Sequence, residues 1–171
     1  KGAALFAKEV PLQGGDTLFS NMYLAYETLS DGLKHLLDSL NAIHDSGEVG
    51  RFSDEFDGMR AKSAERIASV HPVVRIHPRT QKKALFINQE YTTQFEGMTP
   101  EESRPLLEYL FQHSVRPEIT CRVRWQKNTL VVWDNRVTLH SPISDDFAAR
   151  FDKTGFRRVM HRATFTGEKT S

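Results

Sequence analysis

The chain has 171 residues, 39% hydrophobic and 26% charged, which is the composition of an ordinary soluble globular domain. Its 23 basic and 22 acidic side chains nearly balance, so charge does not favour nucleic acid or an anionic membrane as a partner. We find no apolar run near the ~18 residues of a membrane span and no signal-peptide pattern. The single Cys121 excludes an intrachain disulfide and is expected to be a small buried side chain. Together these features predict a cytoplasmic protein.

The first third of the chain is predicted to pass from a strand into helices. Residues 3–10 read as a strand, and because the chain opens directly into it without a methionine, we expect further residues upstream. The glycine pair at 14–15 predicts a turn. Ser20 or Asn21 is expected to cap a helix through Leu29, and Ser30 a second one with a leucine face through Leu40.

The middle of the chain mixes extended segments with one well-marked helix. Residues 46–66 are polar and glycine-dotted, which is typical of a surface excursion or lid. Residues 71–78 are extended because they precede prolines, and 83–88 are expected to be the neighbouring strand. Thr99, followed by Pro100 and a glutamate three residues after the cap, predicts a helix that ends before Pro117.

Strand patterns dominate the C-terminal third. They cover residues 119–125, 129–133 and 156–165, with a polar turn at 126–128. Turn-separated strands with helices inserted earlier predict a mainly β fold, a sandwich or barrel core with flanking helices, forming one domain over residues 1–171. The helix from Pro100 to His113 is expected to cover the sheet, and it is also a candidate surface for a homo-oligomer.

Two basic positions on the last strand, Arg158 and Arg162, share one face and lie roughly 13 Å apart along the backbone. Their planar guanidinium groups could hold the two ends of a small dicarboxylate. On pattern alone, solvated or ion-paired arginines are the simpler interpretation. His140, which follows the polar corner at Asp134 and Asn135, is either a metal ligand or a structural hydrogen-bonding group.

Several blocks of sequence are unusual enough to be specific in combination. They are GGDT at 14–17, AYETL at 25–29, HPVVR at 71–75, KALFIN at 83–88, WDNRVTLH at 133–140 and MHRAT at 160–164. In this order they resemble the taurine dioxygenase family of iron(II)- and 2-oxoglutarate-dependent oxygenases. The resemblance extends over nearly the whole chain and implies a double-stranded β-helix (jelly-roll) core.

The resemblance implies a role for each matching position. His140 is implied as an iron ligand, while Arg162 and Thr17 are implied to bind the distal carboxylate of 2-oxoglutarate, with Arg158 near its keto-acid end. Asp134 and Asn135 are interpreted as corner residues. The substrate pocket is implied to include Tyr91, His44 and Arg162, the first two alternatively being ordinary strand residues.

One departure from the family concerns the metal. The family's iron site consists of two histidines and one carboxylate, and its first two ligands form a His-x-Asp or His-x-Glu pair. None of the seven histidines here has an acidic residue two positions later. We therefore expect the chain to be the C-terminal part of a longer jelly-roll oxygenase domain, with that pair upstream of Lys1; loss of iron is the alternative.

The resemblance implies hydroxylation of a small, anionic organic substrate, such as a sulfonate or alkyl sulfate, with succinate and carbon dioxide as co-products. A polar loop around residues 144–154 is longer than is usual in the taurine enzymes and is expected to alter substrate choice. Two alternatives remain open. One is an oxygenase acting on an amino acid or a carnitine-type precursor, and the other is a non-catalytic jelly-roll module that binds small carboxylates.

Overall fold

The computed structural model describes residues 1–11, 14–46, 67–143 and 158–166, and it is mainly β with a few helices. The chain divides into two compact units. The first unit comprises residues 1–21 and 117–171, and the second comprises residues 22–116. That the two form one domain stays a prediction.

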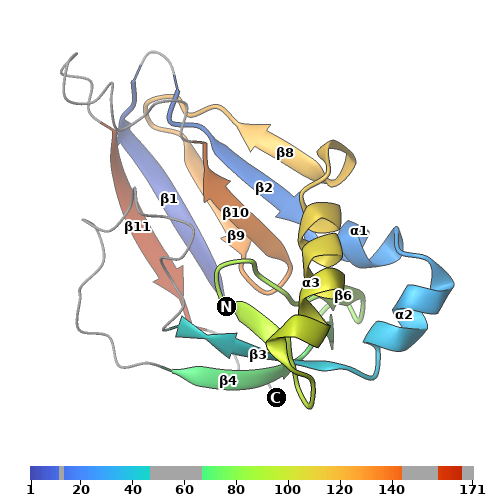
Figure 1. Ribbon diagram of the computed structural model, residues 1–171. Coiled ribbons are helices and arrows are strands. Elements are labelled where there is room, and N and C mark those ends of the chain that lie inside the picture. Colours follow the sequence, from blue (N-terminus) through green and yellow to red (C-terminus); the bar gives the residue numbers. More distant parts are fainter. Residues whose placement is uncertain (12–13, 47–66, 144–157, 167–171) are drawn as a thin grey trace. The chain divides into compact units, whose positions relative to one another are not determined.

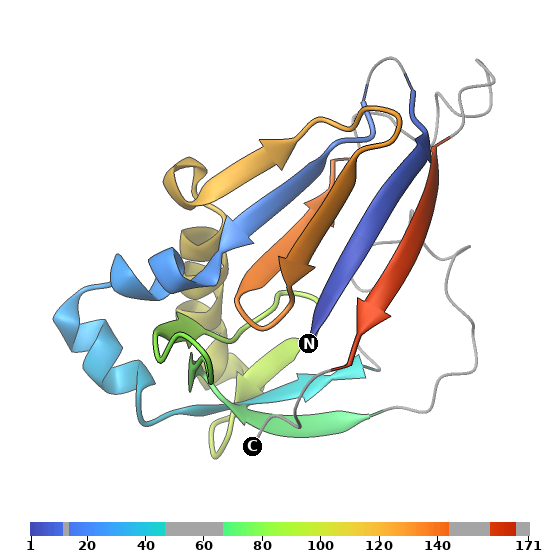
Figure 2. The ribbon, with the colours of Figure 1, turned by 180° about the vertical axis from the view of Figure 1, so that it is seen from behind.

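The first unit contains two antiparallel three-stranded sheets. The strands are β1 (Gly2–Glu9), β2 (Thr17–Asn21), β8 (Thr120–Val123), β9 (Leu130–Asp134), β10 (Thr138–Pro142) and β11 (Val159–Phe165), with a short 3-10 helix at Pro117–Ile119. One sheet has the order β11-β1-β9 and the other β10-β2-β8. The central strand is therefore β1 in the first sheet and β2 in the second (Figures 1 and 2).

The core of this unit lies between the inner faces of the two sheets. Ala3 from β1, Phe19 from β2 and Trp133 from β9 form a buried cluster. The half-buried side chains of Leu5, Val123 and Val131 pack against it. Residues on a strand alternate between faces, so β1 and β2 each direct one set of side chains into this interior. Any residue directly opposite a member of the cluster therefore faces the same space.

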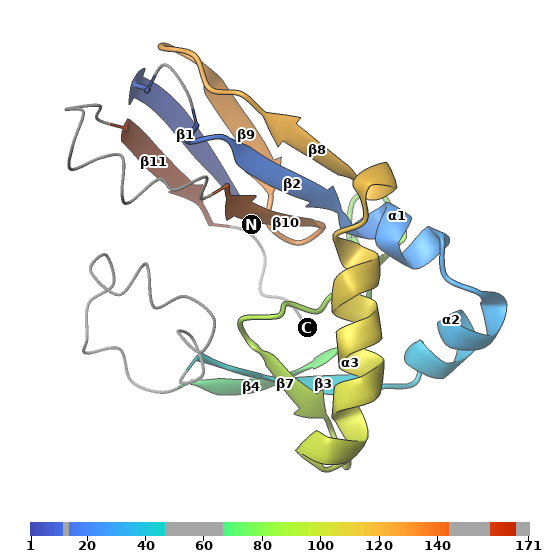
Figure 3. The same cartoon turned by 45° about the horizontal axis from the view of Figure 1, so that its top comes forward.

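The second unit carries the helices and two smaller sheets. Its elements are α1 (Met22–Glu27), α2 (Asp31–Leu37), β3 (Asn41–Asp45), β4 (Ala68–Pro72), β5 (Val74–Ile76), β6 (Lys83–Leu85), β7 (Thr92–Phe95) and α3 (Pro100–Ser114). The sheets have the orders β4-β3-β7 and β5-β6, and all pairs are antiparallel. Helix α3 runs beside β7 (Figure 3).

The helix-start predictions are confirmed by the caps. Ser30 is the N-cap of α2, and its hydroxyl accepts a hydrogen bond from the Leu33 backbone N–H. At α3 the Thr99 hydroxyl accepts from the Glu102 N–H, while the Glu102 carboxylate accepts from the Thr99 N–H. This reciprocal capping box stabilises the first turn. None of the described helices is long and apolar enough to cross a membrane.

One expectation about burial is wrong, and one strand was not predicted. Cys121 is exposed, because it lies on β8, an edge strand of its sheet. The helix predicted after Ser20 or Asn21 is present as α1, but residues 17–21 before it form β2, the central strand of that sheet. The predicted lid at 46–66 and the loop at 144–154 lie outside the described residues, except for Ser46.

Candidate functional site

The turn before β2 contains two consecutive glycines in the left-handed region, with φ of 77° at Gly14 and 72° at Gly15. A side chain is strained in this conformation, which explains the glycine pair. The turn leads into Asp16, a buried residue whose carboxylate lies 2.6 Å from Nε of Arg122 on β8. The ion pair holds the turn against the edge of the sheet and leaves the Gly15 carbonyl available to another donor.

Thr17, the first residue of β2, is buried and has a defined hydrogen-bond role. Its hydroxyl oxygen accepts a bond of 3.0 Å from the indole Nε1 of Trp125, which carries a donor and no acceptor. The hydroxyl must therefore direct its own hydrogen elsewhere. Thr17 is thus fixed as a donor, the role needed to bind a carboxylate oxygen.

Arg158, directly before β11, lies next to the glycine turn and Trp125. Its Nε donates to the Gly15 carbonyl at 3.0 Å, and its guanidinium carbon is 5.8 Å from the centre of the Trp125 ring. Burial lowers the pKa of Arg158, an effect that the carboxylate of Asp16 opposes. In the described part of the chain its terminal nitrogens make no hydrogen bond, so they remain available to an anion. Trp125 therefore connects the predicted residues Thr17 and Arg158.

His140 lies within β10, the strand that pairs with the Thr17 strand β2 on the side away from β8. It is directly opposite Phe19, so its imidazole shares the inner face of the sheet with the buried cluster. The ring centre is 6.0 Å from that of Phe19 and 4.9 Å from that of Trp133, while the residue as a whole remains exposed. The aromatic rings restrict the orientation of the imidazole without enclosing it.

Arg162 also faces the space between the two sheets. It is directly opposite Leu5, whose side chain packs against the buried cluster. Unlike Arg158, Arg162 is exposed and has no described contact with Thr17 or Trp125. The structure thus separates the two arginines in a way that the sequence did not predict: Arg158, rather than Arg162, shares its surroundings with Thr17.

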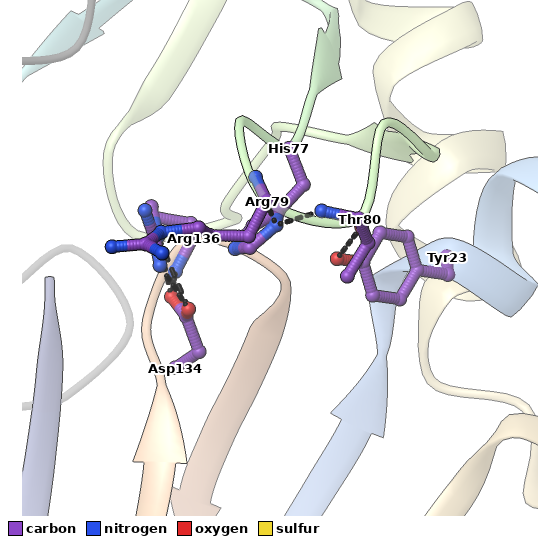
Figure 4. A network of polar contacts seen from close by, with 6 residues as sticks. All are labelled: Tyr23, His77, Arg79, Thr80, Asp134 and Arg136. Atoms are coloured by element: carbon purple, nitrogen blue, oxygen red, sulfur yellow. Dashed lines mark hydrogen bonds and ion pairs between the residues drawn. The ribbon is translucent and has the colours of Figure 1, made fainter.

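The polar corner after β9 orders its own side chains. Asp134 accepts hydrogen bonds from the backbone N–H of Arg136 at 2.9 Å and from its Nε at 2.8 Å, and the two side chains form an ion pair (Figure 4). The amide oxygen of Asn135 accepts from the indole of Trp133 at 2.7 Å. Asp134 and Asn135 are therefore corner residues, as predicted, and they fix the Trp133 ring that contacts His140.

In the second unit, the predicted substrate residues His44 and Tyr91 lie on adjacent chain segments. His44 on β3 pairs with Thr92 on β7, and the Tyr91 carbonyl accepts from the Asp45 N–H at 2.8 Å. His44 is half-buried, and burial together with the positive charges of His71 and Arg75 lowers its pKa to about 4. It is therefore a neutral imidazole at physiological pH.

Another histidine of this unit has a structural role. His77 is buried, and its Nδ1 accepts from the backbone N–H groups of Arg79 at 3.3 Å and Thr80 at 3.2 Å, closing the turn between β5 and β6 (Figure 4). The Thr80 hydroxyl is hydrogen-bonded to Tyr23 at 2.8 Å. These contacts account for the histidine at this position without a ligand.

The described residues do not make up a complete metal site. They contain no group of three or more histidine, cysteine, aspartate or glutamate side chains placed to hold an ion. His140 offers one imidazole, whereas a two-histidine, one-carboxylate site needs three protein ligands. The donor set for a dicarboxylate is more complete, because Thr17 and Arg158 supply a hydroxyl hydrogen and free guanidinium nitrogens in one place.

Sequence reasoning missed several contributors to these sites. Trp125 was placed in a strand, but nothing in the pattern indicated that its indole would orient Thr17. The Gly15 carbonyl was likewise missed, because only the folded chain brings Arg158 back to a turn 143 residues earlier. Arg75, within the HPVVR block, was not considered as a functional residue, and nothing in the sequence pattern indicated that it would lie next to His44 and Phe86.

Comparison with known proteins is consistent with this geometry. The model of the "Taurine catabolism dioxygenase TauD, TfdA family" matches residues 1–164. An alpha-ketoglutarate-dependent dioxygenase, cnsM, of Penicillium expansum is 38% identical over 95% of the chain and 45% of its own length. An alpha-ketoglutarate-dependent sulfonate dioxygenase of Saccharomyces cerevisiae is 33% identical over 80% of the chain and 33% of its own length.

A solved taurine dioxygenase from Burkholderia xenovorans superposes with a TM-score of 0.80 at 32% identity, covering 98% of this chain and 52% of the other. The chain spans less than half the length of the two curated relatives described above. The family match extends over both compact units, including Thr17, His140, Arg158 and Arg162. The chain therefore belongs to the TauD/TfdA family of taurine catabolism dioxygenases.

Proposed function

We propose that the full-length protein is a cytoplasmic iron(II)- and 2-oxoglutarate-dependent dioxygenase with a double-stranded β-helix core. Its proposed substrate is a small anionic molecule, a sulfonate or an alkyl sulfate. The observation that carries the proposal is the grouping of Thr17, Trp125 and Arg158 in the unit that also presents His140 to the space between the sheets. The sulfonate dioxygenase among the relatives supports the substrate class.

Arg158 and Thr17 would bind the distal carboxylate of 2-oxoglutarate. Arg158 is a half-buried cation whose terminal nitrogens bond to none of the described residues, and guanidinium binds carboxylate in a bidentate manner. Thr17 would add one hydrogen bond, because Trp125 occupies an acceptor position of its oxygen. Burial strengthens both contacts, since water competes less well in a region of low polarity.

Arg162 would bind the anionic group of the organic substrate. It lies four residues beyond Arg158 on the same face, roughly 13 Å away along the strand, and is exposed. A position at that distance from the Thr17 group is suited to a second anion rather than to the same carboxylate. Of the two roles predicted for Arg162, this proposal keeps the one in the substrate pocket and gives the distal carboxylate of 2-oxoglutarate to Arg158 and Thr17.

The overall reaction would consume one O₂ and one 2-oxoglutarate for each substrate. One oxygen atom enters the substrate C–H bond as a hydroxyl group, and the other enters succinate as carbon dioxide is released. If the hydroxyl is placed on the carbon that bears a sulfonate or sulfate group, the product collapses to an aldehyde and the sulfur oxyanion. The residues of this chain would orient the two organic substrates for that reaction.

The full-length protein should be tested for succinate formation that requires iron(II), 2-oxoglutarate and O₂, with a panel of sulfonates, alkyl sulfates and aryloxyacids. Turnover of a sulfonate or sulfate supports the proposal. Turnover of none of them rejects the substrate class, and the absence of any 2-oxoglutarate consumption rejects the chemistry. It would then favour the non-catalytic carboxylate-binding module.

Arg162→Ala separates the two assignments of this residue. We expect it to raise the KM for the organic substrate by about tenfold or more while leaving the KM for 2-oxoglutarate within about twofold, as a lost charged contact of over 1.4 kcal/mol would give. The opposite pattern would restore the original assignment of Arg162 to 2-oxoglutarate.

A further inference from the structure

A second basic cluster lies in the other unit, on one face of the β4-β3-β7 sheet. His44 on β3 and His71 on β4 point to the same face, since His71 is opposite Ala42, two residues from His44. Phe86, after β6, packs against both histidines. The three ring centres are 5.3 to 5.4 Å apart, and the guanidinium carbon of Arg75 lies 4.2 Å from the centre of the Phe86 ring.

His44 has one nitrogen satisfied and one not. Its Nδ1 lies 3.3 Å from the hydroxyl of Thr92, and that hydroxyl accepts a bond of 2.8 Å from the Asn88 N–H. If the hydroxyl also donates to Nδ1, the imidazole proton is on Nε2. The opposite tautomer would leave the buried Thr92 hydrogen unsatisfied as well, so the first arrangement is preferred.

Nε2 of His44 is buried and has no hydrogen-bond partner among the described residues. Unsatisfied buried donors are rare in folded proteins, because each costs about 1 to 3 kcal/mol of stability. Such a group is usually paired with a ligand or an ordered water. The described part of the chain therefore supplies no acceptor next to His44.

Arg75 likewise has no hydrogen-bond acceptor among the described residues. Its guanidinium lies over Phe86 but forms no hydrogen bond or ion pair in the described part of the chain. Burial lowers the pKa of Arg75, because it removes the guanidinium from water. A half-buried cation normally has a counterion, since its desolvation is otherwise unfavourable.

One small oxyanion would satisfy both groups. We propose that His44 and Arg75 form an anion-binding site, beside Phe86, for a sulfonate, sulfate or carboxylate group. The Nε2–H would donate to one oxygen, and the guanidinium would supply the charge and further donors. The nearest acidic residue on β3, Asp45, is on the opposite face because it directly follows His44. The inference does not depend on the dioxygenase activity.

The test uses the full-length protein and three probes: inorganic sulfate, methanesulfonate and acetate, each compared with sodium chloride at equal ionic strength. Binding is measured by ligand-observed NMR and by the shift of the thermal unfolding midpoint. We expect at least one probe to bind, and Arg75→Met and His44→Gln to weaken its binding by about tenfold or more. Arg79→Met is the matched control, because Arg79 is an exposed arginine of the same unit.

Binding of methanesulfonate but not sulfate would identify an organic sulfonate as the ligand, and equal binding of both would identify a general oxyanion site. The inference is overturned if no probe binds, as would happen if a carboxylate elsewhere in the full-length protein fills the site. It is also overturned if Arg75→Met and Arg75→Lys both bind as the wild type does. Because binding is measured without turnover, failure here is distinct from failure of the proposed enzyme activity.

Discussion

Arg158 and Arg75 are half-buried guanidinium groups in different units, and their surroundings differ in an instructive way. Both lie over an aromatic ring, and burial lowers the pKa of both. Arg158 also donates to the Gly15 carbonyl and lies near the carboxylate of Asp16. Arg75 has neither kind of partner in the described chain. The first arginine is held in place by the fold, whereas none of the described residues forms a hydrogen bond or ion pair with the second.

This difference indicates two kinds of anion site. Around Arg158 the protein supplies a fixed donor, Thr17, and a scaffold that orients it, as expected where a ligand must be held in one position. Around Arg75 the described residues supply the Phe86 ring, His71 and the unsatisfied His44 nitrogen, but no bonded partner for the guanidinium. The fold preorganises the first site, and a ligand would complete the second.

The largest expected effect is on 2-oxoglutarate binding. Arg158→Met in the full-length protein should raise the apparent KM for 2-oxoglutarate by about 100-fold, because losing one partner of a desolvated charge pair costs about 2 to 5 kcal/mol. Steady-state succinate formation measures it. Arg79→Met should match the wild type. An unchanged KM for Arg158→Met would show that this arginine does not bind the co-substrate.

The next effect is the pH dependence of the free energy of unfolding, to which His44 of the second site should contribute. The pKa of His44 is about 4 in the folded chain against 6.5 for an ordinary histidine, so the unfolded chain binds the proton more readily between these values. The free energy of unfolding should therefore decrease as pH falls from 6.5 to 4, by about 1 to 3 kcal/mol after allowing for partial exposure. Urea unfolding at pH 7 and pH 4.5 measures it.

His44→Gln should lose this part of the pH dependence, because glutamine does not titrate, while His35→Gln at an exposed position should retain it. Saturating methanesulfonate should reduce the loss at low pH, since an anion favours the protonated imidazole. Identical pH profiles for the wild type and His44→Gln would show that His44 is not desolvated in the protein.

The sequence predicted these two regions unequally. The strand carrying Arg158 and Arg162, the helix after Thr99 and the turn at Gly14 were recognisable because propensity, capping and alternation all act locally. Strand β2 was not recognised. Its first residue, Thr17, follows a turn, and its last residue, Asn21, directly precedes a helix, so five residues gave too short a pattern.

The partners of each site residue depend on distant parts of the chain. The residues Arg158 and Thr17 were predicted from the resemblance, but their connection through Trp125 depends on bringing β2 and β8 together. The resemblance likewise implied that Arg162 binds the distal carboxylate of 2-oxoglutarate, with Arg158 near the keto-acid end of that molecule. Arg158 and Arg162 share one face of the strand, but this does not determine which residues each guanidinium group contacts. That Arg75 and Nε2 of His44 have no partner among the described residues could be recognised only from the folded chain.

A smaller effect tests the scaffold of the preorganised site. Trp125→Phe keeps an aromatic ring next to Arg158 but removes the N–H that donates to Thr17. We expect the KM for 2-oxoglutarate to rise about fivefold, the value of one hydrogen bond of about 1 kcal/mol. Equal KM values for Trp125→Phe and the wild type would show that Thr17 needs no orientation.

The smallest expected effect is on stability, and it is measured by comparing Arg158→Met with Arg75→Met. Arg158→Met should lower the free energy of unfolding by about 1 to 2 kcal/mol, because the Gly15 carbonyl loses its donor.

Arg75→Met should leave the free energy of unfolding unchanged or raise it by up to about 1 kcal/mol. The variant loses a cation–π contact worth about 0.5 to 1 kcal/mol. It also no longer buries a charge, because methionine fills similar space, and this stabilisation offsets the lost contact. Both are measured by urea unfolding in chloride buffer without oxyanions. If Arg75→Met destabilises the protein as much as Arg158→Met does, then Arg75 has a partner within the full-length protein, and the contrast between the two sites does not hold.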